Sequence, residues 1–152
     1  MRRSTVFALI VAGAVVFLAV STVLARVFSV DAAERSAITG LISAQAQGDA
    51  AGMARRIHDC ERTASCRPRV DANAAALKHP GTVSIIQIQP SAGFSLGSTL
   101  GTARVAWQAG GSLPIVQCIR VRRAGNAVSG FNVQLLAVTP RIRSDADCPA
   151  TF

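Results

Sequence analysis

The sequence predicts an α+β protein in which an N-terminal transmembrane helix precedes three helices packed on a curved four-stranded antiparallel sheet. Three observations lead to this fold class. An uncharged apolar run lies within the first thirty residues, residues 31–80 place apolar side chains at helical spacing, and residues 82–138 alternate apolar and polar side chains as strands do. At 152 residues, the chain has room for one domain beside the apolar run.

The apolar run covers residues 6–25 and contains no charged side chain. As a helix rising about 1.5 Å per residue, it matches the roughly 30 Å of hydrocarbon in a bilayer. Arg2 and Arg3 precede it, and the positive-inside rule then keeps the N-terminus in the cytoplasm and exports the rest. We therefore predict a cytoplasmic stub and signal-anchor helix over residues 1–30, with the chain fixed to the membrane by residues 6–25.

A signal peptide cleaved after Ala25 is the alternative, and it would make the protein secreted. The small residue at the end of Val23-Leu24-Ala25 suits a signal peptidase. The apolar run is longer than the ~7–15 residues of a typical signal core, which favours an uncleaved anchor. Either reading places the domain outside the cytoplasm.

The helical part begins with Asp31-Ala-Ala-Glu34, which resembles a capping box and predicts a helix start at Asp31. Apolar positions then follow helical spacing and end at Gly48, after which Asp49 caps a short second helix. Pro68 begins a third helix, which ends at Pro80-Gly81. The residues expected to face inward from the first helix are Ile38, Leu41, Ile42 and Gln45.

Four strands are predicted over residues 83–89, 102–108, 113–123 and 128–138, with a possible bulge at Ile85-Ile86. The short connections make the sheet antiparallel and leave one face for the helices. This α+β domain covers residues 31–140, and residues 141–152 form a tail. The residues expected on the inner face are Ala103, Val105, Trp107, Leu113, Ile115, Ile119, Val121, Phe131, Val133, Leu135 and Ala137.

Four cysteines in an exported domain favour two disulfides, for which three pairings exist. Cys60 and Cys66 are separated by a short loop and close easily. A bond between Cys118 and Cys148 would attach the tail to the sheet. We therefore predict the pairs Cys60–Cys66 and Cys118–Cys148.

A metal site is the alternative reading of the region around the first cysteine pair. The candidate ligands are His58, Cys60, Cys66 and His79. Their spacing matches no usual zinc pattern, because one residue separates His58 from Cys60 and no Cys-x-x-Cys is present. We expect neither a metal nor another cofactor.

The exported part holds thirteen basic residues against eight acidic ones, a net charge of +5. Arg104, Arg120 and Arg122 fall on the polar face of the predicted sheet, where they would form a basic stripe if their strands are neighbours. A solvated surface is the favoured interpretation, and anionic lipid or an envelope polyanion is the alternative. Nucleic acid is not an expected partner, because the domain lies outside the cell and no aromatic stacking stripe accompanies the arginines.

The order of elements resembles the NTF2-like group of cone-shaped α+β domains, which includes SnoaL and ketosteroid-isomerase-type enzymes, and among them the membrane-anchored or secreted bacterial members. The features that carry this resemblance are a long first helix, a short second helix starting at Gly48-Asp49-Ala50-Ala51, a third helix and the sheet. It covers residues 31–138, and a cystatin-like arrangement is the neighbouring alternative. The resemblance implies a cone whose pocket serves ligand binding, protein contact or catalysis, so it does not fix the function.

The first functional hypothesis is a non-enzymatic, membrane-anchored extracytoplasmic domain of a bacterial cell envelope. Its partner would be an envelope protein or an apolar ligand. If their side chains face inward, the residues that would line the pocket are Phe94, Leu96, Trp107 and Phe131.

The second hypothesis is an isomerase or hydratase of the SnoaL or ketosteroid-isomerase type. Such chemistry needs a carboxylate base and a neutral hydrogen-bond donor inside an apolar cone. The chain has no Tyr, and none of its acidic residues falls within a predicted strand. Asp31 and Glu34 in particular are interpreted as helix-start or surface residues. We therefore predict no catalytic residues.

Overall fold

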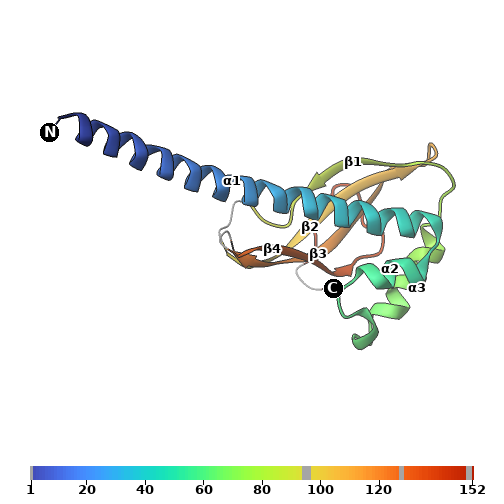
Figure 1. The fold of residues 1–152 in the computed structure, drawn as a ribbon. Helices are drawn as coiled ribbons and strands as arrows, with labels where there is room; N and C mark the ends of the chain where they lie inside the picture. The colour runs from blue at the N-terminus through green and yellow to red at the C-terminus, as the bar shows by residue number, and fades with distance from the viewer. Residues whose placement is uncertain (1, 94–96, 127–128, 150–151) are drawn as a thin grey trace.

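The computed structural model describes residues 2–93, 97–126, 129–149 and 152 and confirms an α+β architecture (Figure 1). A long N-terminal helix is followed by short helices and by one open, antiparallel sheet of four strands in the order β1-β2-β3-β4. The elements are α1 (Arg2–Gln47), α2 (Ala50–Arg56), η1 (Cys60–Arg62), α3 (Cys66–Ala76), β1 (Val83–Gln89), β2 (Thr99–Ala109), β3 (Ile115–Asn126) and β4 (Gly130–Val138).

Helix α1 is continuous over 46 residues, which corrects the prediction of a membrane helix followed by a separate helix from Asp31. No Gly or Pro lies between Ala25 and Asp31, so nothing interrupts the backbone hydrogen bonds there. Asp31 and Glu34 do not cap a helix, because their carboxylates bind Arg123 of β3. The predicted domain boundary after residue 30 therefore falls inside a helix.

The connection from α1 to α2 matches the sequence prediction. Gly48 takes a left-handed conformation with φ of 75°, and a Cβ at this position would lie 2.9 Å from the Lys78 side chain. The Asp49 carboxylate caps α2 by accepting a hydrogen bond of 2.8 Å from the Gly52 amide. Helix α3 begins at Cys66 instead of Pro68, because the first turn of a helix tolerates proline.

The sheet has the predicted bulge in β1, where the register shifts between Ile85 and Gln87. Strand β3 starts at Ile115, because Pro114 has no N–H to pair. Leu113 is therefore 77% exposed and does not belong to the inner face, contrary to the prediction.

A second register shift corrects the predicted inner face of β4. Val121 pairs with Leu135, whereas Arg120 pairs with Ala137, so one extra residue lies between the two pairs on β4. Because side chains alternate along a strand, this bulge moves Ala137 to the outer face beside Arg120. Val138 takes its place on the inner face and is 1% exposed.

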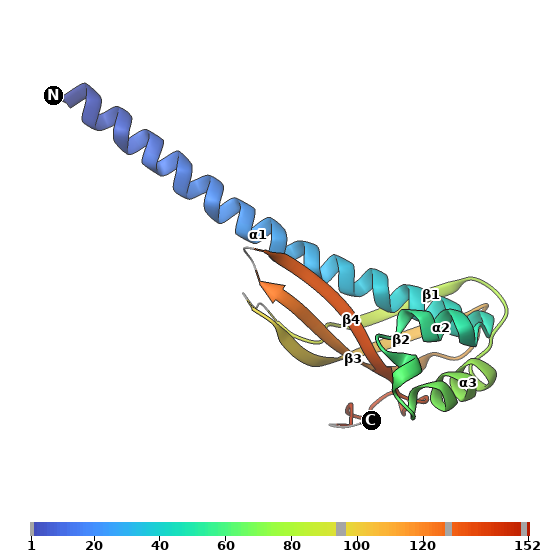
Figure 2. The ribbon, with the colours of Figure 1, turned by 60° about the horizontal axis from the view of Figure 1, so that its bottom comes forward.

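The core lies between the inner face of the sheet and the helices, with α1 running along the strands (Figures 1 and 2). Ile38, Leu41 and Ile42 of α1 are fully buried in it, as predicted. The fully buried strand residues in the same cluster include Ala103, Val105, Trp107, Ile119 and Val121.

Polar side chains inside the core satisfy one another. Gln45 and Gln117 exchange hydrogen bonds of 2.7 and 3.2 Å. The Trp107 indole donates to Gln117 Oε1, and Gln117 Nε2 and Asn73 Nδ2 both donate to the Thr139 carbonyl. Buried polar groups with such partners avoid the cost of lost hydration and fix the register of α1 on the sheet.

Both predicted disulfides are present. Cys60–Cys66 joins η1 to the start of α3. Cys118–Cys148 attaches the tail to β3, and the Ile142 amide also donates to the Val116 carbonyl at 2.8 Å. The tail is therefore held against the sheet by covalent and hydrogen bonds.

Candidate membrane anchor and its junction with the domain

The N-terminal half of α1 projects from the domain (Figure 2). Its sequence is apolar on all sides of the helix. Its most apolar 18-residue window has no residue buried inside the protein. Phe7 and Phe17 are each 70% exposed, and Leu18 is 63% exposed. A continuous apolar surface of this size needs a nonpolar environment, and its length fits a bilayer. The segment fits a membrane anchor or a signal sequence.

A polar side chain inside this segment is satisfied within the helix. The Thr22 hydroxyl donates to the Leu18 carbonyl at 2.8 Å. Bonding to the preceding turn removes the cost of placing a free hydroxyl in hydrocarbon. Thr22 is therefore compatible with a membrane span.

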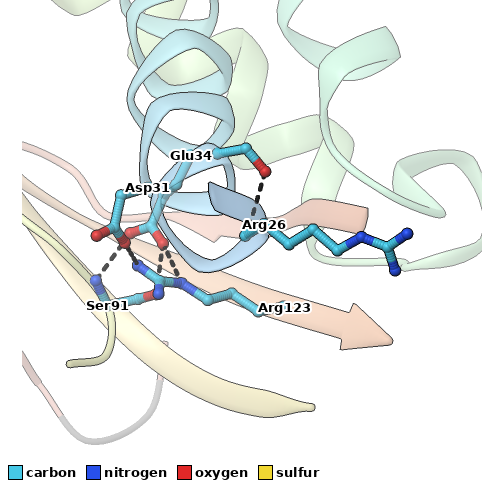
Figure 3. A network of polar contacts seen from close by, with 6 residues as sticks. Arg26, Asp31, Glu34, Ser91 and Arg123 are labelled. Atoms are coloured by element: carbon cyan, nitrogen blue, oxygen red, sulfur yellow. Dashed lines mark hydrogen bonds and ion pairs between the residues drawn. The ribbon is translucent and has the colours of Figure 1, made fainter. Parts of the chain in front are cut away.

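Four residues form a polar junction where α1 enters the domain: Asp31, Glu34, Ser91 and Arg123 (Figure 3). Arg123 Nε lies 2.7 Å from Glu34 Oε2, and one of its terminal nitrogens lies 2.6 Å from Asp31 Oδ1. Glu34 also accepts bonds of 2.8 Å from the Ser91 amide and 2.9 Å from the Ser91 hydroxyl. The junction therefore joins α1 to β3 and to the chain that follows β1.

The central pair of the junction is almost completely buried. Arg123 is 3% exposed and Glu34 is 1% exposed, which corrects the prediction that Glu34 is a helix-start or surface residue. Removing these charges from water is costly, and the cost is offset only because both partners are present in good hydrogen-bond geometry. The pair thus requires α1 to stay docked on the sheet.

A glycine in β2 makes room for this junction. A Cβ at Gly101 would lie 1.9 Å from the Ser91 carbonyl oxygen, a distance that no side chain tolerates. Gly101 thus allows the Ser91 backbone to approach β2 closely and to present its amide to Glu34.

Sequence reasoning missed Arg123 and Ser91, although the sequence holds a signal for Arg123. In the alternation of β3, Arg123 falls on the same face as Ile119 and Val121, which are buried. Glu34 likewise precedes Ile38 by four residues, on the inward stripe of the helix. Opposite charges on two apolar faces indicate a buried ion pair. Ser91 bears no comparable signal.

The predicted pocket residues occupy different places. Phe94 and Leu96 lie outside the described residues. Trp107 is fully buried, donates to Gln117 at 2.9 Å and has its ring 6.5 Å from that of His79. Phe131 is half-buried at the start of β4. Trp107 pairs with Ile115 and Phe131 pairs with Gly125, ten residues further along β3, so the two rings lie at opposite ends of the sheet.

The predicted basic residues share the outer face of the sheet, because β2 and β3 are neighbours. Arg104 is paired with Cys118, Arg120 with Thr102, and Arg122 with Leu100. Arg122 is exposed, whereas Arg104 and Arg120 are half-buried. Arg104 donates to the carbonyl of Ser144 in the tail, which therefore covers part of the basic stripe.

A small cavity of about 170 Å³ lies beside the first cysteine pair. Its lining combines apolar side chains of α3 and β4 with two arginines, Arg69 and Arg120, and with the ring of Phe152. Drug-sized ligands occupy pockets of about 300–1,000 Å³, so this cavity suits a small group rather than a whole ligand of that size.

The candidate metal ligands are not gathered around a common point. Cys60 and Cys66 bond to each other, which makes both sulfurs unavailable as thiolate ligands. Within the part of the chain that the structure describes, no group of three His, Cys, Asp or Glu residues is placed to hold a metal ion.

Comparison of the chain with protein-family models, curated proteins and solved structures finds no significant match.

Proposed function

We propose that this protein is a non-enzymatic, membrane-anchored domain that binds a partner outside the cytoplasm, in a bacterial cell envelope. The observation that carries the proposal is the unbroken helix. The exposed apolar segment, residues 6–25, continues into the half of α1 that is buried in a disulfide-bonded domain. Disulfides belong to oxidising compartments, which supports a position outside the cytoplasm.

An uncleaved anchor is the form of this proposal that we favour. The bond after Ala25 lies within the helix, and a peptidase acts on it only after local unwinding. The junction opposes unwinding, because Asp31 and Glu34 are held on the sheet about two turns away and about two and a half turns away. Arg2 and Arg3 support an N-terminus on the cytoplasmic side.

We also propose an NTF2-like domain. One long helix, two short helical elements and α3 precede four antiparallel strands, and the helices share one face of the sheet. Within such a fold we propose binding rather than isomerase chemistry, because the buried carboxylate of Glu34 is already engaged by Arg123 and Ser91.

Alkaline carbonate washing of membranes tests the anchor. The full-length chain, with its calculated mass of 15.8 kDa, is expected in the membrane pellet. Val15→Arg places a charge in the apolar segment at a cost of about 2.5–3.5 kcal/mol and is expected to shift protein toward the supernatant. Leu113→Arg is the matched control, because Leu113 is 77% exposed but lies outside the apolar segment.

Two outcomes would contradict the proposal. Release of the wild-type chain at its full mass would show that residues 6–25 do not anchor it. A soluble product lacking the first 25 residues would show that they are a cleaved signal.

A further inference from the structure

We propose that one end of the domain lies on the phospholipid headgroups of the membrane that holds α1. This hairpin end consists of the described residues 98–100, 125–126 and 129–130, at the start of β2 and around the turn between β3 and β4. The inference rests on the proposed function, because it takes residues 6–25 as the anchor.

The first support is the short distance between the apolar segment and the folded domain. Arg26 is the first charged residue after the segment, and Val30 is already buried at 3% exposure. These residues are four positions apart, which is about 6 Å along a helix. Since α1 is unbroken here, the domain is attached to the membrane without a flexible linker.

The second support is the depth that the hairpin end reaches. Arg123 contacts Asp31 and Glu34, so these three residues lie at the same height along the axis of α1. From Arg123, β3 continues toward the membrane for three residues to Asn126, which is about 10 Å at about 3.3 Å per residue. From the midpoint of Asp31 and Glu34 back to Arg26, α1 also covers about 10 Å. Figures 1 and 2 both show the end of β3 and the start of β4 beside α1 where it leaves the domain.

The third support is the chemistry of the hairpin end. Ser98 Oγ donates to the Gly125 carbonyl at 3.1 Å and accepts from the Gly125 amide at 3.0 Å. These bonds hold the segment before β2 against the end of β3. Two apolar side chains are exposed here, Leu100 at 53% and Phe28 of α1 at 69%. Arg122 pairs with Leu100 and is also exposed. Apolar side chains with an arginine nearby suit the boundary between acyl chains and lipid phosphates.

This placement also determines what faces away from the membrane. Gln47 lies 21 residues beyond Arg26 on α1, or about 32 Å at 1.5 Å per residue. The segments at that end are the start of α2 and the residues that follow α3, because the His79 amide donates to the Ala46 carbonyl at 3.0 Å. This end is therefore held about 30 Å above the headgroups and presented to a partner.

Fluorescence quenching by lipids tests the contact. The oxidised full-length chain is reconstituted in nanodiscs of phosphatidylethanolamine and phosphatidylglycerol, with the environment-sensitive fluorophore NBD on Ser129→Cys. Leu113→Cys is the matched control, since it lies at the opposite end of the sheet and Leu113 is 77% exposed. Lipids that carry a nitroxide near the headgroup are expected to quench the probe at position 129 several-fold more strongly than the probe at position 113.

A second variant tests the role of the helix. A short Gly-Ser insertion after Arg26 is expected to leave the protein in the carbonate pellet and to lower quenching at position 129 to the level at position 113. Equal quenching at the two positions without the insertion, in protein that resists carbonate, would overturn this inference and leave the anchor intact. Unchanged quenching after the insertion would overturn the claim that α1 sets the contact. Release by carbonate would overturn the anchor and this inference together.

Discussion

At the scale of single residues, the junction explains why two neighbouring arginines of β3 have different roles. Arg122 is exposed on the outer face, and its charge is hydrated. Arg123 points to the inner face, where Glu34 and Asp31 neutralise it. A buried ion pair contributes little net stability when intact, but removing one partner leaves an unpaired charge in the core. The junction therefore specifies the position of α1 on the sheet.

Arg123→Met is expected to lower the free energy of unfolding by about 3 kcal/mol, because it leaves Glu34 buried without its cation. Arg122→Met is the matched control and is expected to change it by less than about 0.5 kcal/mol. Denaturant unfolding, followed by the fluorescence of the single tryptophan, Trp107, measures both values. Equal effects of the two substitutions would contradict the assigned role of the junction.

At the scale of elements, the sequence indicates which segments form helices and strands better than it indicates where they end or which way a bulged strand faces. Asp31-Ala-Ala-Glu34 has the pattern of a helix start, yet the same two acids are used as ion-pair partners inside a continuous helix. The register shift between Arg120 and Val121 exchanges the inner and outer faces for the last residues of β4, and no local sequence pattern indicates it. Both features depend on contacts with segments far away in the sequence.

The two disulfides are expected to stabilise the domain unequally, because they close loops of different length. Their sequence separations are 30 for Cys118–Cys148 and 6 for Cys60–Cys66. Loop-closure entropy then gives about 3.6 kcal/mol for the first and about 2.2 kcal/mol for the second. Replacing each pair by alanines and comparing denaturant midpoints tests this order. A larger loss for Cys60→Ala/Cys66→Ala would contradict it.

At the scale of the whole molecule, the sequence predicts the α+β fold class and the apolar helix, because both depend on composition or on local periodicity. It predicts the cysteine pairs from a short loop and from a tail with no other attachment. The junction is beyond such reasoning, since Glu34 and Arg123 are 89 residues apart. The pocket residues predicted from the sequence also depend on long-range strand pairing. Trp107 and Phe131 share an apolar face of the predicted sheet, but register separates them by most of the length of β3.

The proposed orientation of the chain across the membrane leads to a prediction about its thiols and its C-terminus. Alkylation under non-reducing, denaturing conditions is expected to modify none of the four cysteines of the exported protein, because all are in disulfides. A reporter enzyme fused after Phe152 that is active only outside the cytoplasm is expected to be active. Four alkylated thiols with an inactive reporter would place the domain in the cytoplasm.

The position of α1 at the start of the chain has a consequence for biosynthesis. Its inward stripe, which includes Ile38, Leu41 and Ile42, emerges from the ribosome long before the strands that cover it. Arg123 and Leu135 are made much later, so under the proposed topology the nascent polypeptide would pass through translocation with an uncovered amphipathic helix close to the lipid. In that case the bilayer surface would shelter the stripe until β4 arrives, and the membrane would serve as a scaffold for maturation as well as an attachment point.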